Sequence, residues 1–301
     1  MMKNPENNFS AQWIKYSDYE LVELKKTKYI KPKEDAIYEL YDPFECADEI
    51  LVDILNIGRI VNENIDKIEE IQEIVLDFVK KYGLMGELTY LPLNSNIIFQ
   101  KKVILPKRNP FTKKDEMSIK EYLENFLVCD KNKRIDIFIT KDKNAPIGIS
   151  NLNEITPNLF LNKGLEYNIV FSKGYSEQIQ WIIEYAIYLY LIFINIEVYY
   201  TEKNDSEKRL SEFRIQTFKA DNITCKIEML KTPTLVWDFK SLKQAIDTML
   251  LLNETTERKT VKMCKHCRKA FSSQNLKAEY CSPQCRNQAN VYKSRAKNKE
   301  T

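Results

Sequence analysis

The sequence predicts an α+β fold, with a body of residues 1–256 in which helices predominate over a small antiparallel hairpin, and a small C-terminal unit of residues 257–301. Three observations predict it. Apolar residues recur at three- and four-residue steps in several segments, and they alternate with polar residues in another. Four of the seven cysteines lie close together near the C-terminal end. A chain of 301 residues is long enough for one large domain or two ordinary ones.

Two helices are predicted early in the body. Residues 47–60 carry acidic residues at their start, which suits the positive end of a helix. Residues 65–82 have a clearer apolar face, made by Ile68, Ile71, Val75, Phe78 and Tyr82. Gly83 stands where a left-handed residue ends a helix, and Leu84 would then pack back on Val79 in a Schellman motif.

The middle of the body gives weaker signals. Residues 101–115 are basic and contain prolines, which predicts a loop; a second phosphate-contacting patch is the alternative. A helix over 118–127 and a short strand over 135–139 follow.

The apolar stretch of residues 181–200 is predicted to be a buried core helix, with Ser176 as its N-cap. A membrane span is the alternative. Glu184 and Glu197 leave only twelve uncharged residues between them, fewer than the ~20 that a spanning helix needs.

A hairpin is predicted over residues 213–229, with Asp221 and Asn222 at the turn. The residues expected to share a face alternate along each strand: Phe213, Ile215 and Thr217 in the first, and Ile223, Cys225, Ile227 and Met229 in the second. A short apolar piece, 235–237, comes next. A last helix of the body begins at Ser241, with one apolar face made by Leu242, Ala245, Ile246, Met249 and Leu250.

Composition excludes several classes of enzyme. No two of the six glycines stand two apart, so the Gly-x-Gly dinucleotide fingerprint and the Walker A loop are both absent. His266 is the only histidine, which excludes a His-Glu-x-x-His metalloprotease and leaves residues 1–265 without a histidine base for a hydrolase triad. The sequence therefore identifies no catalytic residue, and a non-enzymatic role is favoured.

Charge divides the chain unevenly. Residues 257–301 contain twelve Lys or Arg and three Glu, a net of +9, so residues 1–256 carry −6 of the chain's overall +3. An acidic body with a basic end is typical of a nucleic-acid-binding module joined to another unit. The odd number of cysteines and the polar start of the chain predict a reducing, cytoplasmic location.

The last four cysteines predict a metal site. Cys264 and Cys267 form one close pair, and Cys281 and Cys285 form a second after thirteen residues. Four thiolates in two pairs suit one structural Zn²⁺ ion, because zinc takes four soft ligands in a tetrahedron and a full shell leaves no position for a catalytic water. Ser282 and Pro283 predict that a helix begins between Cys281 and Cys285.

The thirteen residues between the two pairs are expected to form a short hairpin with Phe271 and Tyr280 as its aromatic core. A cysteine turn, a hairpin and a metal-bound helix together predict a treble-clef-like zinc finger. His266 is expected at the surface or beside the metal ligands.

The helix after Cys285 is predicted to place Cys285, Ala289, Tyr292 and Ala296 on the metal side. A neighbouring stripe holds Arg286, Asn290, Lys293 and Lys297, and Arg295 adds charge. Such a stripe suits contact with a phosphate backbone, and Asn287, Gln288 and Asn290 suit base edges. Docking of another protein, or cations that only complement the helix dipole, are the alternatives.

Residues 264–295, CKHCRKAFSSQNLKAEYCSPQCRNQANVYKSR, resemble the CGNR-type zinc finger of bacterial ABATE-domain proteins, and Glu73 to Gly86 is similar to a helix-plus-glycine stretch of that group. The resemblance implies that the four cysteines bind zinc and that Asn287 matches the motif's Asn. Arg286 replaces the motif's Gly and Gln288 its Arg, so the finger is a variant or belongs to a sister family. A bacterial DNA-binding regulator with an N-terminal sensing domain is what the resemblance implies.

Two hypotheses follow from the sequence. In the first, the finger binds nucleic acid, DNA in preference to RNA, and the body binds a small molecule or protein; a homodimer is a natural arrangement. In the second, residues 1–256 hold an active site or a protein-binding site, and zinc only stabilises the fold. A pocket that gathers titratable groups would favour the second hypothesis, whereas a mainly apolar cavity would favour sensing.

Overall fold

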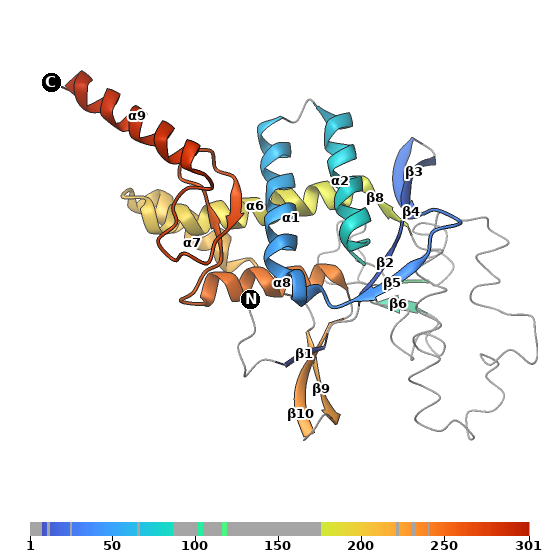
Figure 1. Ribbon diagram of the computed structural model, residues 1–301. Helices are drawn as coiled ribbons and strands as arrows, with labels where there is room; N and C mark the ends of the chain where they lie inside the picture. Colours follow the sequence, from blue (N-terminus) through green and yellow to red (C-terminus); the bar gives the residue numbers. More distant parts are fainter. Residues whose placement is uncertain are drawn as a thin grey trace, which may run out of the picture.

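Helices and small, mostly antiparallel sheets are mixed in the computed structural model (Figure 1), which confirms the α+β prediction at this level. The structure describes residues 8–10, 13–24, 26–64, 67–86, 102–104, 116–118, 176–220, 223–229, 233–239 and 241–300.

Helix α1 (Ala47–Glu63) lies at the centre of the body and crosses α6 (Ile179–Thr201), against which it packs. It also packs against α2 (Ile68–Tyr82) and α8 (Leu242–Thr255). Its buried positions are Ala47, Ile50, Leu51, Ile54, Leu55, Ile57, Gly58 and Val61. These positions recur with helical period, so one helix face fills the space between its neighbours.

Helix α6 is the core helix that the sequence predicts. By length and composition alone it could cross a membrane, but 61% of its most apolar window is buried inside the structure. The predicted N-cap is wrong. Ser176 is buried before strand β8 (Glu177–Gln178), and Gln178 occupies the N-cap position without a side-chain capping bond.

Helix α2 ends at Gly83, as predicted. Gly83 has a φ of 87°, a conformation that favours glycine, and its N–H donates to Val79 O at 2.7 Å. Its ψ of 177° is extended, so the left-handed geometry of a Schellman motif is not adopted. The chain instead turns toward strand β2 (Trp13–Tyr16), where the Trp13 indole N–H donates to Leu84 O at 2.9 Å.

The first forty residues contain strands that sequence reasoning missed. Strands β2 (Trp13–Tyr16) and β5 (Tyr38–Tyr41) pair antiparallel, and β4 (Thr27–Pro32) pairs with both β3 (Tyr19–Leu24) and β8. A 3-10 turn, η1 (Pro43–Cys46), leads into α1. The strands are short and rich in Lys and Glu, so their apolar alternation is weak.

The hairpin predicted over residues 213–229 has the wrong first strand. Phe213 and Ile215 lie in α7 (Asp205–Gln216), a helix capped by Asn204, whose side chain accepts from Ser206 N; Thr217 follows as its C-cap. The expected turn, 221–222, falls among residues that the structure does not describe.

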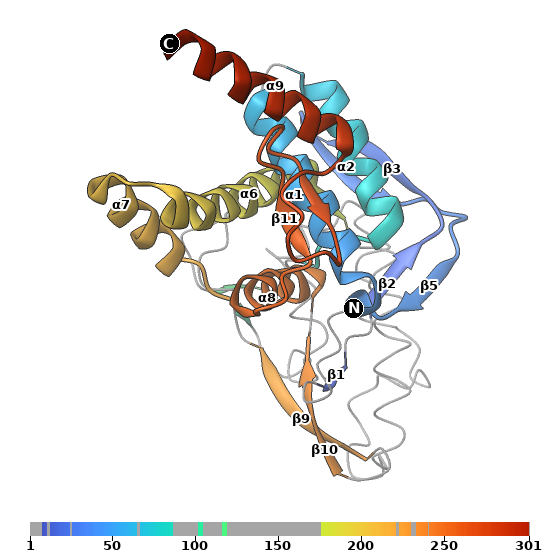
Figure 2. The same ribbon diagram turned by 60° about the vertical axis from the view of Figure 1, so that its left-hand side comes forward.

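The second predicted strand is correct but pairs forward along the chain. Strand β9 (Thr224–Met229) forms an antiparallel hairpin with β10 (Pro233–Asp238), which contains the apolar piece 235–237. Strand β1 (Asn8–Ser10) adds to β10 in parallel. This sheet projects from the body in both views (Figures 1 and 2).

The basic segment 101–115 is not wholly a loop. Strand β6 (Lys102–Ile104) lies at its start and pairs with β7 (Glu116–Ser118). Strand β7 ends at Ser118, which was predicted to be the first residue of the helix 118–127. The rest of that helix and the predicted strand 135–139 lie outside the described ranges.

Helix α8 is predicted correctly. The Ser241 hydroxyl accepts from Gln244 N at 3.1 Å and caps the helix. All five residues of its predicted apolar face are buried: Leu242, Ala245, Ile246, Met249 and Leu250.

Candidate metal centre

The first cysteine pair lies in the turn of a hairpin. Strands β11 (Val261–Met263) and β12 (Ala270–Ser272) pair antiparallel, and the chain between them carries Cys264 and Cys267. Cys264 N donates to Lys269 O at 2.9 Å and Arg268 N donates to Cys264 O at 3.0 Å, which closes the turn. The hairpin therefore brackets the first pair. The prediction that it lies wholly between the two pairs is wrong, because β11 precedes Cys264.

Arg268 has a φ of 58°, in the left-handed region that favours glycine. No glycine follows Cys267 in the sequence, so the tight turn was not signalled by residue type. Backbone hydrogen bonds on both sides of the turn hold this conformation. Phe271 and Tyr280, the expected aromatic core of the spacer, are only half-buried.

The second pair lies at the start of α9 (Pro283–Glu300), as Ser282 and Pro283 predict. Ser282 Oγ accepts from Cys285 N at 3.2 Å, and Arg286 N donates to Ser282 O at 3.2 Å. The cap sets the direction of the first helical turn. As a result, the Cys285 side chain lies near that of Cys281 and near the hairpin turn.

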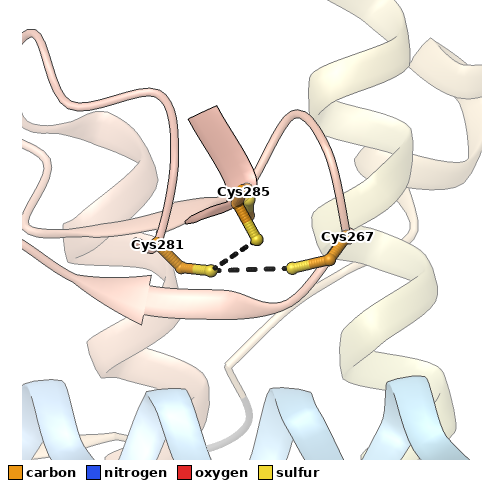
Figure 3. A group of neighbouring side chains, drawn as sticks. Cys267, Cys281 and Cys285 are labelled. Carbon is orange, nitrogen blue, oxygen red and sulfur yellow. Dashed lines mark hydrogen bonds between the residues drawn. The ribbon is translucent and has the colours of Figure 1, made fainter. Parts of the chain in front are cut away.

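The four sulfurs converge on one point (Figure 3 labels three of them). The ligand atoms of Cys264, Cys267, Cys281 and Cys285 all lie within 4.8 Å of one another. Cys281 Sγ lies 3.6 Å from Cys267 Sγ and 3.5 Å from Cys285 Sγ. A tetrahedron with metal–sulfur bonds of about 2.3 Å separates its sulfurs by roughly 3.8 Å. The cluster therefore fits one metal ion, and these cysteines are free thiols rather than disulfides.

The electrostatics of the cluster also fit a cation. Burial raises the pKa of the Cys264 thiol, but N–H groups of Cys267, Cys281 and His266 outweigh it and lower that pKa to about 6. Burial, and then hydrogen bonds with the neighbouring thiols, raise the pKa of Cys281 to about 12. Without a cation, the protein thus stabilises the thiolate of Cys264 and disfavours the thiolate of Cys281. A bound divalent cation would remove that opposition.

The cysteine hairpin is attached to the body by two amide side chains that each bond a whole peptide unit. Asn253, fully buried on α8, accepts from Val261 N at 3.0 Å and donates to Val261 O at 3.0 Å. The Asn56 side chain on α1 accepts from Ala270 N at 2.9 Å and donates to Ala270 O at 3.0 Å. Each amide substitutes for a neighbouring strand, so the two outer edges of the hairpin are bonded to the body.

Asp48, in the first turn of α1, adds a third attachment. Its two carboxylate oxygens accept from the Thr260 hydroxyl at 2.8 Å and the Ser272 hydroxyl at 3.0 Å. The side chains of Val261, Met263 and Ala270 are buried in the same core as α1 and α6. Sequence reasoning missed all three anchors, because a lone Asn or Asp on a helix carries no pattern.

We expect Asn253→Ala to lower the free energy of unfolding by about 3 kcal/mol, because it leaves the buried N–H and C=O of Val261 unbonded. Asn56→Ala should cost less, since Asn56 is only half-buried and water can replace it. Urea unfolding followed by circular dichroism measures both, with exposed Asn62→Ala as the control. Equal stability of the Asn253 and Asn62 variants would contradict the anchoring.

The predicted nucleic-acid residues all lie on α9. Arg286, Asn287, Asn290, Lys293 and Arg295 are exposed, and Lys297 lies further along the helix, where side chains are outside the description. Figures 1 and 2 show α9 at the edge of the molecule, with its C-terminal end pointing away from the body. The structure thus leaves the described part of the predicted cationic stripe, Arg286, Asn290 and Lys293, accessible.

His266 lies between the metal cluster and α9. Its Nε2 is 2.8 Å from Gln288 Oε1, and its ring stacks on that of Tyr292 with centroids 5.8 Å apart. The sequence left two positions open for His266, at the surface or beside the ligands, and its half-buried ring agrees with both. The predicted metal-side face is only partly covered, because Cys285 and Ala289 are half-buried while 62% of Tyr292 is exposed.

The described residues thus hold a tetra-cysteine cluster compatible with a zinc site, anchored to a helical core, with a cationic helix leaving it. Comparison with protein families, with curated proteins and with solved structures found no match.

Proposed function

We propose that this protein binds one structural Zn²⁺ ion through its four clustered cysteines and uses the resulting finger, of treble-clef-like form, to bind nucleic acid. DNA is the preferred target, and the protein acts as a bacterial cytoplasmic regulator, as the family resemblance implies. The observation that carries the proposal is α9, a helix that starts at the cluster and presents exposed cations away from the body.

The metal assignment rests on the donor set. Four sulfurs within 4.8 Å are soft ligands, which zinc prefers, and together they fill its coordination shell. Such an ion would supply folding energy and no reactive position. Its role would be to hold the start of α9 against the cysteine hairpin.

The arrangement of α9 supports backbone contact. Its 18 residues span about 27 Å, close to the ~34 Å of one turn of duplex DNA. Arg286, Asn290 and Lys293 recur at three- and four-residue steps and so share one side. Cations suit phosphates, and the amides of Asn287 and Asn290 suit adenine edges in the major groove.

The body offers a cavity that suits a sensing role. It has a volume of about 340 Å³ and lies between α6, α7 and α8. Its lining is mostly apolar: Ile192, Ile196, Tyr199, Tyr200, Ile215, Phe218, Leu250 and Leu251, with Glu212, Gln216, Glu254 and Thr255. An apolar cavity favours a small-molecule sensor over an active site.

The same cavity is connected to the finger through Glu254. That residue also lines a smaller hollow, of about 140 Å³, beside Val261 and Met263 of β11. Its neighbour Asn253 is hydrogen-bonded to the backbone N–H and C=O of Val261. A ligand that shifts the end of α8 would therefore act directly on the hairpin. In this proposal the regulator works as a homodimer, since one small finger provides few contacts.

Lys293→Ala is expected to weaken binding to duplex DNA and to reduce the slope of log affinity against log salt by about 0.9, because one phosphate contact is lost. Fluorescence anisotropy with a labelled duplex at several salt concentrations measures both quantities. Lys203→Ala, an exposed cation on the body between α6 and α7, is the matched control and should change neither.

A wild-type affinity that does not vary with salt would contradict the proposal. Equal effects of the two lysine variants would place binding away from α9. The same titration with duplex RNA of equal length tests the preference for DNA.

A further inference from the structure

Tyr292 is an exposed aromatic residue with one side already stacked. Its ring and that of His266 are 5.8 Å apart and inclined by only 21°, while 62% of Tyr292 is accessible. At this centroid distance the two rings are offset, so His266 lies against part of the Tyr292 ring and leaves the rest of it accessible.

A hydrogen bond orients the stacked pair. Gln288, one turn before Tyr292, has its Oε1 2.8 Å from His266 Nε2 and thereby fixes the imidazole. His266 is the residue before Cys267, and Tyr292 lies two helical turns after Cys285. Both rings therefore belong to segments that carry a cysteine of the cluster. A platform that is ordered before binding loses little conformational entropy when a ligand arrives.

The surroundings favour an anionic ligand. Arg295 lies one turn after Tyr292 on the same side of α9, and Lys293 is the next residue, about 100° around the helix. Both are exposed. An open π-face flanked by cations is the combination by which proteins hold single-stranded nucleic acid, with the base on the ring and the phosphates on the cations.

We infer that Tyr292, backed by His266, is a stacking platform for an unpaired base, so that the finger binds single-stranded nucleic acid at a face of α9 that adjoins the Arg286–Lys293 stripe and shares Lys293 with it. The inference rests on the proposed nucleic-acid function and specifies its ligand. Bases inside a duplex are stacked on one another and offer only their edges, so the platform takes no part in duplex binding.

The test compares three probes by fluorescence anisotropy: an oligothymidylate of about ten nucleotides, an abasic strand with the same backbone, and a duplex of the same length. Wild type is expected to bind oligothymidylate about tenfold more tightly than the abasic strand, from one stacked base. Tyr292→Leu should abolish this difference and leave abasic and duplex affinities unchanged. Tyr292→Phe should retain it.

Lys293→Ala is the matched control, because it should weaken all three probes and preserve the ratio between oligothymidylate and the abasic strand. Bound zinc and the thermal midpoint should be the same in every variant. If Tyr292→Leu fails to hold zinc, photocrosslinking of wild type to 5-iodouracil in the same oligonucleotide replaces it, and the crosslink should map to Tyr292.

A tenfold preference that persists in Tyr292→Leu, or a crosslink confined to other residues, would overturn the platform and leave the proposed function standing. Wild type that binds none of the three probes would overturn both. Equal wild-type affinity for the oligothymidylate and the abasic strand, with normal duplex binding, would refute the platform alone.

Discussion

Cys281→Ala should release the metal ion and unfold α9, while the body keeps its structure. Structural zinc contributes on the order of 10 kcal/mol to the fold of a small site. Besides the proposed metal, α9 is held to the hairpin by the stacking of Tyr292 and the Gln288 bond, both on His266. By contrast, Asn253 and Asn56 hold β11 and β12 without any metal.

Hydrogen exchange with mass spectrometry, together with metal analysis, measures this result. Amides of residues 284–295 should lose protection, whereas those of Val261 and Ala270 should keep it. Cys46→Ala is the matched control, because Cys46 lies in η1, away from the cluster. Wild type purified without a transition metal, yet with α9 protected, would contradict the metal site and with it the proposed finger.

Gly58→Ala should lower the free energy of unfolding by about 3 kcal/mol or more. A Cβ at Gly58 would lie 2.1 Å from Ala186 O and 2.7 Å from Tyr190 Cβ, both on α6. A backbone carbonyl cannot move aside as a flexible side chain can, so α1 and α6 would have to separate. Because both helices belong to the central core, the loss of packing would extend along their contact.

The sign of the change in unfolding free energy shows whether Gly58 is in close contact with α6. Alanine is a better helix former than glycine by about 1 kcal/mol, so a Gly58 that faced open space would give a more stable variant. Urea unfolding distinguishes the two signs. Asn62→Ala, at an exposed position of the same helix, is the control and should change stability by no more than about 0.5 kcal/mol. A stabilised Gly58→Ala would contradict the close α1–α6 contact.

Helices with a single apolar face could be predicted from the sequence because their period directly records which side is buried. In α8, the capping Ser241 predicted where the helix starts, and the regular apolar face predicted which of its residues are buried. In α7 the same reasoning failed. The alternation of Phe213 and Ile215 spans too few residues to distinguish a strand from a polar helix, and 67% of Phe213 is exposed.

The sequence by itself determined the four-cysteine cluster, since the cysteine spacing, the Ser282 cap and the Pro283 start all act within a few residues of one another. Only the tertiary structure decided how this cluster joins the body. Asn56 bonds Ala270 across 214 residues of chain, and an amide that binds a distant peptide looks in sequence like any other asparagine. Local geometry is encoded by neighbouring residue types, whereas long-range pairing exists only after the core has brought the partners together.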